Sequence, residues 1–245
     1  MVKVKLIPTY RFVNSRCSLR GNPVDLAFGK AIDTALAQYN YYQSWTRRSL
    51  LMEAMKCAMK VFTEELRKQG VELSDGERRM YAGRAWRMLS CWRKSKYTGL
   101  LRPRTRVVLL ERSGMVYGVF AQPDFWDRDR VFYEVKSYNV EKDEDAGRCA
   151  KEQCRVFALL GELRLIYFTE DANGYYTLVE RRVERDLGVL NELWEYILKL
   201  SDDECTYREL KELEDYHPIV KYRFNTDTGK WEYLGTWSLR PGRTL

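Results

Sequence analysis

The sequence lacks features on which several classes of protein depend. It contains one histidine, His217, so mechanisms that need two histidines from one chain, such as those of H-E-x-x-H metalloproteases, are excluded. No G-x-S-x-G segment accompanies His217, which argues against a serine hydrolase triad and favours an ordinary loop histidine. No apolar run is long enough for a membrane span, and residues 1–20 lack the apolar stretch of a signal peptide. We therefore expect a soluble, intracellular (cytoplasmic) protein without a membrane partner.

The cysteines also lack the spacing of a metal site. The six cysteines include no C-x-x-C pair, and they are Cys17, Cys57, Cys91, Cys149, Cys154 and Cys205. Zinc and iron–sulfur sites usually need close ligand pairs. We therefore predict no zinc and no iron–sulfur cluster, and we interpret the cysteines as small buried hydrophobic residues in a reducing compartment.

Positive charge is concentrated in the first part of the chain. The net charge is +7, but residues 1–105 hold 21 Lys and Arg against 8 Asp and Glu, whereas residues 106–245 hold 21 against 27. Such an asymmetry is expected when one part of a protein meets a polyanion. The alternative is that the basic side chains only solvate long helices.

Hydrophobic periodicity predicts a helical first half and a mixed second half. Helices are expected at 24–45, 46–69 and 74–96, after an irregular segment at 1–23, and the third helix begins with a capping box of Ser74 and Glu77. Later elements are an antiparallel meander of strands at 106–111, 115–121 and 131–137, a helix at 145–160, strands at 163–169 and 175–182, a helix at 184–200 and a hairpin at 221–234.

Two carboxylates and one lysine are predicted to converge on the meander. Asp124 follows Pro123, and ten residues later Glu134 and Lys136 stand two apart on a strand, so they share a face. The turn at 127–129 is expected to bring Asp124 back beside that face. Alternatively, Asp124 caps a turn while Glu134 and Lys136 form a surface ion pair.

This constellation suits a divalent metal. Two enclosed carboxylates repel each other unless a cation binds between them, and oxygen ligands favour Mg²⁺ or Mn²⁺. Asp124 and Glu134 are the predicted ligands, with the carbonyl oxygen of Val135 as a further one. A metal held in this way polarises a phosphate, while Lys136 orients a water molecule or stabilises developing charge.

The P-D…E-x-K pattern resembles the PD-(D/E)xK nuclease superfamily, and most closely its RecB-like branch, which includes Cas4 proteins and lambda-type exonucleases. The branch has an N-terminal G-x-x-x-H motif, and here Gly29 is followed by Asp33 in place of the metal-binding histidine. The resemblance therefore adds Asp33 as a fourth candidate ligand of the metal, since aspartate suits hard cations. Gln153 and Phe157 are similar to its Q-x-x-x-Y motif, whose glutamine lies beside the catalytic lysine. Lys151 and Arg155 flank this motif and could contact phosphate. The alternative is a plain amphipathic helix with a solvated Asp33 for the first segment, and a glutamine of the core for the second.

The resemblance implies an α/β (α+β) fold with a restriction-endonuclease-like core, in which helices flank a central mixed sheet of about five strands. A single nuclease domain is then expected to cover 1–245. Residues 1–100 would form a basic helical elaboration, 101–200 the catalytic core and 201–245 an extension with the hairpin. Some members use an extra acidic ligand, for which Glu111 is a candidate, although a solvent-facing strand residue is the simpler interpretation. The iron–sulfur cysteines of Cas4 proteins have no counterpart, since only Cys205 follows Cys154.

The basic helices are predicted to guide DNA toward this site. Their phosphate-binding candidates are Arg87, Arg93, Lys94 and Lys96. The resemblance implies a metal-dependent deoxyribonuclease acting on ends or single strands, in repair, recombination, CRISPR adaptation or viral DNA processing. Alternatives are a catalytically weak nucleic-acid-binding module of the same fold, or an assembly protein with accidental spacing. The C-terminal extension is a candidate surface for a second copy or a protein partner.

Overall fold

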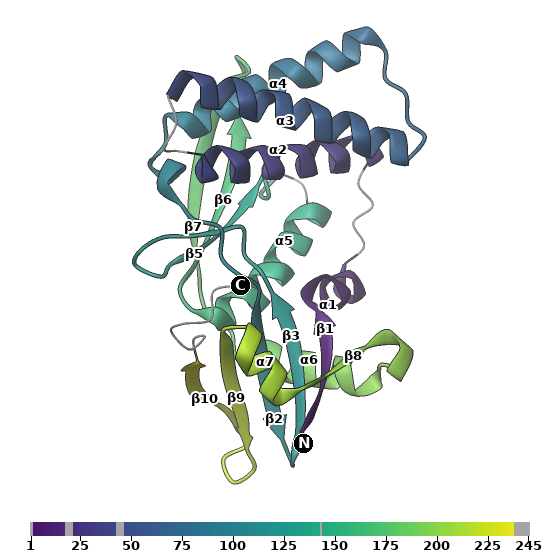
Figure 1. The fold of residues 1–245 in the computed structure, drawn as a ribbon, viewed down its shortest axis with the longest axis vertical. Coiled ribbons are helices and arrows are strands. Elements are labelled where there is room, and N and C mark those ends of the chain that lie inside the picture. Colours follow the sequence, from purple (N-terminus) through teal and green to yellow (C-terminus); the bar gives the residue numbers. More distant parts are fainter. Residues whose placement is uncertain (1, 18–21, 43–46, 143, 238–245) are drawn as a thin grey trace.

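Two β-sheets and seven α-helices make up the described part of the chain (Figure 1). The computed structural model describes residues 2–17, 22–42, 47–142 and 144–237. The strands are β1 (Lys3–Pro8), β2 (Arg106–Arg112), β3 (Met115–Ala121), β4 (Phe125–Trp126), β5 (Phe132–Lys136), β6 (Leu163–Glu170), β7 (Tyr176–Val183), β8 (Thr206–Glu209), β9 (Ile219–Asn225) and β10 (Lys230–Trp237). The helices are α1 (Thr9–Arg16), α2 (Pro23–Tyr41), α3 (Arg47–Lys68), α4 (Asp75–Arg93), α5 (Glu144–Phe157), α6 (Gly188–Lys199) and α7 (Leu210–Tyr216).

The prediction of a mixed α/β protein is confirmed, but the prediction of one central sheet is wrong. A six-stranded mixed sheet has the order β10–β9–β2–β3–β1–β8, and a separate four-stranded sheet has the order β4–β5–β6–β7. The expected meander is broken because β3 pairs with β2 and β1, while β5 pairs with β4 and runs parallel to β6. Alternation of apolar residues predicts a strand but does not specify its partner.

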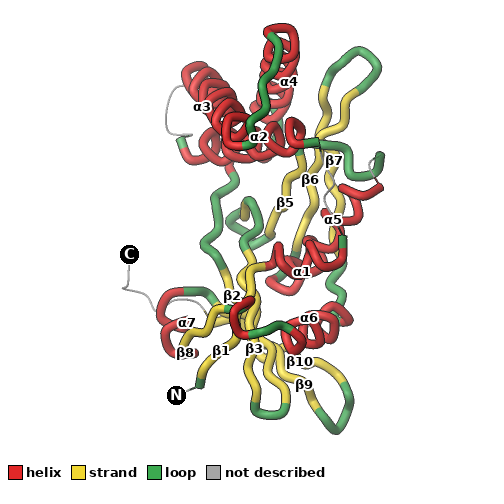
Figure 2. The backbone as a smooth tube through the Cα atoms, turned by 90° about the vertical axis from the view of Figure 1, so that its right-hand side faces the viewer, coloured by secondary structure: helices red, strands yellow, loops and turns green. Residues whose placement is uncertain are grey.

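The three basic helices cover one face of the four-stranded sheet (Figure 2). Apolar residues of α2, α3 and α4 pack in one cluster with Tyr133 and Val135 of β5 and with Ile166 and Phe168 of β6. The three helix predictions are confirmed, including the capping box of Ser74 and Glu77, although the predicted end at Trp45 lies outside the described residues. The sequence therefore builds a helical layer directly above β5.

A larger core lies on the opposite face, between the two sheets. Side chains from α1, α5 and α6 join residues of both sheets in this cluster, which includes Phe132 and Leu165. The other face of the six-stranded sheet is covered by Leu213 of α7. Helix α5 thus lies against the face of β5 that carries Phe132, Glu134 and Lys136.

Several helices and strands near the two ends of the chain were not predicted from the sequence. The segment expected to be irregular contains β1 and α1, and β1 runs parallel to β3 inside the six-stranded sheet. Strand β8 and helix α7 were also missed, whereas the predicted strands at β6 and β7 and the hairpin of β9 and β10 are confirmed. Lysines at positions 3 and 5 hide the strand pattern, although Lys5 folds over to donate a hydrogen bond to the Leu200 carbonyl oxygen.

A disulfide corrects the interpretation of two cysteines. Cys17, at the end of α1, is bonded to Cys149 of α5, with 5.6 Å between their Cα atoms. Cys57, Cys91, Cys154 and Cys205 are free thiols. Sequence spacing gave no sign of this pair because 132 positions separate the two cysteines.

Loss of the disulfide is expected to lower the free energy of unfolding by about 3–5 kcal/mol, since a long closed loop restricts the unfolded chain. The check is urea unfolding of oxidised wild type and of Cys17→Ser/Cys149→Ser, with Cys205→Ser as a control that keeps the bridge. Thiol titration of the denatured, unreduced protein should count four thiols, because two of the six cysteines are bridged. A count of six would contradict the pairing.

Gly147 allows α5 to approach the preceding loop. A Cβ atom at this position would collide with the Val140 carbonyl oxygen. We expect Gly147→Ala to destabilise the protein by at least about 2 kcal/mol, because backbone must move. Gly83→Ala on α4 is the matched control, since its Cβ would meet only Arg87 Nη1 at an ordinary 3.6 Å. Equal melting temperatures for the two variants would refute this close approach.

Candidate active site

Strand β5 presents the predicted acid and base on one face. Tyr133 and Val135 face the helical layer, while Phe132 belongs to the core on the side of α5. Glu134 and Lys136 alternate with these residues and therefore point toward α5. Both stand in the parallel ladder with β6, opposite Leu165 and Tyr167. The shared face expected from the spacing is present.

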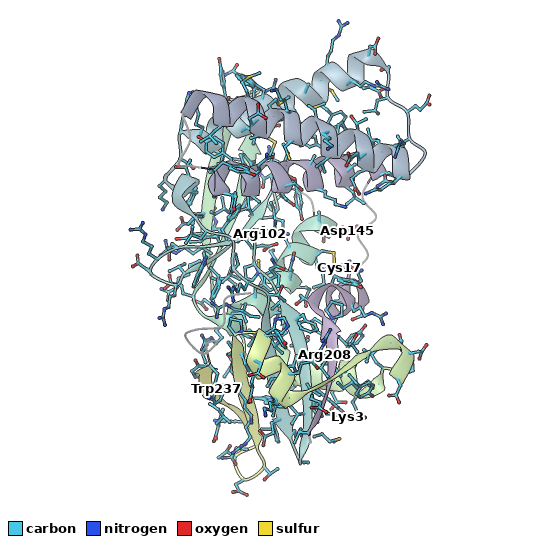
Figure 3. The ribbon with its side chains drawn as sticks, viewed as in Figure 1. Lys3, Cys17, Arg102, Asp145, Arg208 and Trp237 are labelled. Carbon is cyan, nitrogen blue, oxygen red and sulfur yellow. A yellow bond between two sulfur atoms is a disulfide. The ribbon has the colours of Figure 1, made fainter. Side chains whose placement is uncertain are left out.

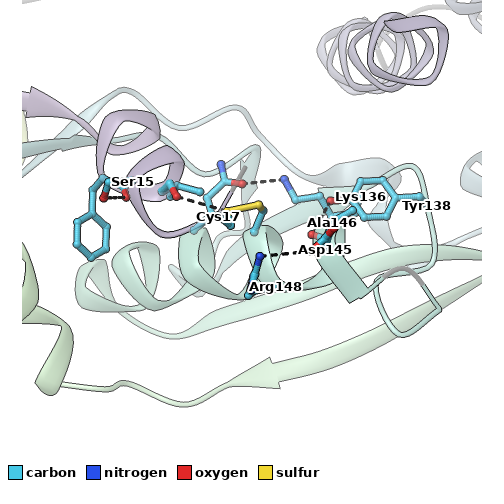
Figure 4. The surroundings of a disulfide bond; sticks show 11 residues. Ser15, Cys17, Lys136, Tyr138, Asp145, Ala146 and Arg148 are labelled. Carbon is cyan, nitrogen blue, oxygen red and sulfur yellow. Dashed lines mark hydrogen bonds and ion pairs between the residues drawn. A yellow bond between two sulfur atoms is a disulfide. The ribbon is translucent and has the colours of Figure 1, made fainter. Parts of the chain in front are cut away.

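Lys136 lies at the centre of a hydrogen-bond network. Its ammonium group donates to Glu134 Oε1 at 2.6 Å and to Gln153 Oε1 at 2.9 Å. Gln153 comes from α5, one turn after Cys149, and Figure 4 shows the disulfide beside the hydrogen bond that Lys136 donates. The structure thus brings together three of the four predicted catalytic residues, and helix α5 fixes the position of the lysine.

Asp124 is the fourth predicted residue, and the backbone of β5 holds it in place. Its Oδ2 atom accepts a hydrogen bond from the Val135 amide at 2.8 Å. Asp124 directly precedes β4, which pairs with β5 through Phe125 and Tyr133. Val135 itself is buried, and the role of its carbonyl oxygen as a ligand stays a prediction.

The carboxylates of this cluster resist ionisation. Burial raises the pKa of Glu134 to about 8, and the charge of Asp124 adds to the rise. Burial also raises the pKa of Asp124, against the opposing charge of Lys136. Burial alone would lower the pKa of Lys136, but Glu134 and Asp124 outweigh it and raise that pKa. Full ionisation of these carboxyl groups would give the cluster more negative charge than its single ammonium group balances.

Asp33 interacts electrostatically with Asp124 and Lys136, but it lies at the cavity rather than in the core. Burial within the molecule raises its pKa to about 8, followed by the charge of Asp124. Unlike Glu134, Asp33 is not fully enclosed, because it lines a cavity and is exposed there. Gly29, one turn earlier on α2, comes so close to β5 that a Cβ atom would lie 3.2 Å from Ser137 Oγ. This approach of α2 places Asp33 beside the end of β5.

A cavity of about 620 Å³ opens between α2, α4 and the end of β5. Asp33 and Lys136 line it together with Arg84, Lys30 and Tyr138. The sequence did not single out these last three residues as site residues. Arg84 is one of many arginines on α4, and it is positioned by its packing over the Phe28 ring, 4.9 Å from the centroid, its pairing with Asp25 and its hydrogen bond to the Tyr176 hydroxyl.

The predicted DNA-binding residues divide into two groups. Arg155 bonds to Glu152, Asp186 and Glu192, while Arg87 pairs with Glu170 at 3.4 Å and Lys96 with Glu180 at 3.0 Å. Their charges are therefore already neutralised. The exposed residues Arg93, Lys94 and Lys151 form no ion pair with the rest of the described chain.

Glu111 does not join the cluster. It lies on β2 of the six-stranded sheet and pairs with Lys221 at 2.5 Å and Arg223 at 3.1 Å. The possibility of an extra acidic ligand at this position is therefore not supported, and a strand ion pair accounts for the residue.

No family model matches the sequence, and no curated protein matches it either. Within residues 2–17, 22–42, 47–142 and 144–237, no helix is both long and apolar enough to span a membrane. In the same part of the chain, no three His, Cys, Asp or Glu side chains are arranged to enclose a metal ion by themselves. The site is therefore judged by its own geometry.

Proposed function

We propose that the protein is a divalent-metal-dependent phosphodiesterase that cleaves DNA. One observation carries this proposal. Glu134 Oε2 is buried and accepts no hydrogen bond from an amine, amide or hydroxyl group of the described residues, while the Asp124 carboxyl group lies beside Glu134. A buried carboxylate oxygen without a partner costs free energy, and a cation is the partner that would remove this cost.

The donor set fits Mg²⁺ or Mn²⁺ bound jointly with substrate. Magnesium sites often use one or two carboxylates together with substrate phosphate oxygens, so two protein ligands are sufficient. Glu134 and Asp124 would hold the cation, and Asp33 is near enough to act electrostatically on Asp124. A bound divalent cation would supply charge stabilisation at the scissile phosphate.

The protein's own residues would carry the other roles. Lys136 has its ammonium group between Glu134 and Gln153, which holds it rigidly without using all three of its protons. The remaining proton can be donated to a phosphate oxygen or to the attacking water. Gln153 is a positioning residue, because it touches Lys136 rather than a reacting atom. The cavity beside Lys136 gives the substrate strand access to this group.

Cleavage of end-labelled DNA tests the proposal. Single-stranded and duplex DNA are incubated with Mg²⁺, Mn²⁺ or EDTA, using wild type and Asp124→Asn. Cleavage that needs metal and is lost in the variant supports the proposal, and the product ladder shows whether it starts at ends. DNA binding without cleavage under any metal condition would favour the nucleic-acid-binding module instead.

A further inference from the structure

Five arginines without carboxylate partners gather beside the candidate active site. Three precede β2 and two lie in the turn between β4 and β5. They are Arg102, Arg104, Arg106, Arg128 and Arg130, here called the arginine cluster. The basic tract expected from the sequence runs along α4 and continues into the loop with Arg102 and Arg104, but it does not include Arg128 and Arg130 of the turn between β4 and β5.

Backbone pairing brings the two segments of the cluster together. Leu101 and Trp126 exchange two backbone hydrogen bonds of 2.8 Å, outside the named ladders. Arg106 packs on the aromatic rings of β4 and β5, with its guanidinium carbon 4.8 Å from the Phe132 ring centroid and 5.5 Å from that of Trp126. Arg102 and Arg128 therefore belong to one surface, although they are far apart in the sequence.

The cluster keeps its positive charge. None of its five arginines forms an ion pair with the residues that the structure describes. Asp127, inside the turn, accepts hydrogen bonds from the Val131 amide and the Tyr133 hydroxyl, which leaves Asp129 as the other acid of the turn. Counting both acids, residues 102–106 and 127–131 carry a net charge of +3.

Two arginines of the cluster, Arg106 and Arg130, lie close enough for their charges to oppose each other. Burial lowers the pKa of Arg106, and the nearby charge of Arg130 lowers it further. Arg130 also has a φ angle of 65°, a left-handed conformation that is costly for a residue with a side chain. By contrast, Arg87, Lys96 and Arg155 have carboxylate partners within the protein.

The cluster is continuous with the active site. Asp124 directly precedes β4 and the turn that carries Arg128 and Arg130. Arg102 follows Leu101, whose backbone is bonded to that of Trp126, two residues after Asp124. Figure 3 shows Arg102 in the middle of the molecule, below the helical layer.

We propose that the arginine cluster binds the phosphodiester backbone of the substrate strand next to the cleavage site, and this inference rests on the proposed function. Guanidinium groups match phosphate oxygens in pairs and bind them without reading base sequence. The cluster consists of loop and turn residues and presents no helix to a groove, so a single strand of DNA is the partner that it fits best.

Measuring DNA affinity without metal tests the arginine cluster independently of cleavage. The probe is fluorescein-labelled single-stranded DNA in EDTA, measured by anisotropy over a range of salt concentrations. Arg102→Gln/Arg104→Gln/Arg128→Gln is expected to raise Kd at least about 10-fold and to reduce the slope of log Kd against log salt by about 2. The matched charge control is Lys199→Gln/Lys211→Gln/Lys230→Gln, which removes three exposed lysines of α6, α7 and β10, and for which we expect a change below about 3-fold.

Replacement of the same three arginines by lysine retains the charge and should restore most of the affinity. An arginine-to-glutamine variant of the cluster that binds as tightly as wild type, or a larger loss of affinity in the lysine control, would overturn the inference. If wild type cleaves DNA but the Gln variant binds and cleaves normally, only this inference fails. If wild type neither binds nor cleaves DNA, the proposed function fails with it.

Discussion

Replacement of Lys136 by methionine is expected to lower the rate of metal-dependent DNA cleavage by about 10³-fold. Lys136 is the ammonium group that lies among Asp124, Glu134 and Gln153 at the wall of the cavity. Methionine retains the length of the side chain but supplies neither a proton nor a positive charge. The rate loss should therefore appear in kcat, with a smaller effect on KM.

The control for this variant is Lys199→Met, which removes an exposed lysine at the end of α6. Single-turnover cleavage with saturating protein isolates the chemical step for both variants. Circular dichroism verifies that each is folded. Lys136→Met activity within about 10-fold of wild type would remove Lys136 from the reaction, because a general acid or charge stabiliser contributes more than this.

Glu134→Gln is expected to make the metal-free protein less sensitive to rising pH. The pKa of Glu134 is raised from 4.5 to about 8 in the folded protein, so the folded state binds the proton more tightly than the unfolded state. The contribution of Glu134 to the free energy of unfolding should therefore be largest below pH 4.5. It should be lost as the pH rises from 4.5 to about 8. The loss is on the order of a few kcal/mol, and glutamine removes it because it cannot ionise.

The measurement is urea unfolding from pH 5 to pH 9 in EDTA, for wild type and Glu134→Gln. Saturating Mn²⁺ at pH 8 should then raise the melting temperature of wild type by about 5–10 °C and leave the variant unchanged. Glu162→Gln is a suitable control, because Glu162 is an exposed glutamate that precedes β6. Parallel stability curves for wild type and Glu134→Gln would show that Glu134 is ionised normally in the folded state.

Local elements of the fold were predictable, but their assembly was not. The heptad-like spacing in α3 and the capping box of α4 depend on neighbours a few residues apart, and both were predicted correctly. The division into two sheets depends on β1, which lies between β3 and β8. Lysines within β1 interrupt the apolar pattern by which the strand could have been recognised in the sequence. The disulfide likewise joins positions 132 apart, and no local pattern reports such a pair.

The site shows the same division between local and long-range information. Glu134 and Lys136 could be placed on one face because a strand alternates, and Gln153 could be named from its helical spacing to Phe157. The position of Arg84 in the cavity depends on packing between α2 and α4. The neutralisation of Arg155 also needed the fold, since Asp186 and Glu192 follow it by more than thirty positions.

The measurement that tests the central claim most directly is the binding of Mn²⁺, followed by electron paramagnetic resonance in the presence of short single-stranded DNA. Wild type is expected to bind the ion, while Asp124→Asn and Glu134→Gln should each lose that binding and remain folded. Retention of the bound ion in both variants, or no bound ion in wild type, would contradict the assignment of Asp124 and Glu134 as the ligands of a catalytic metal.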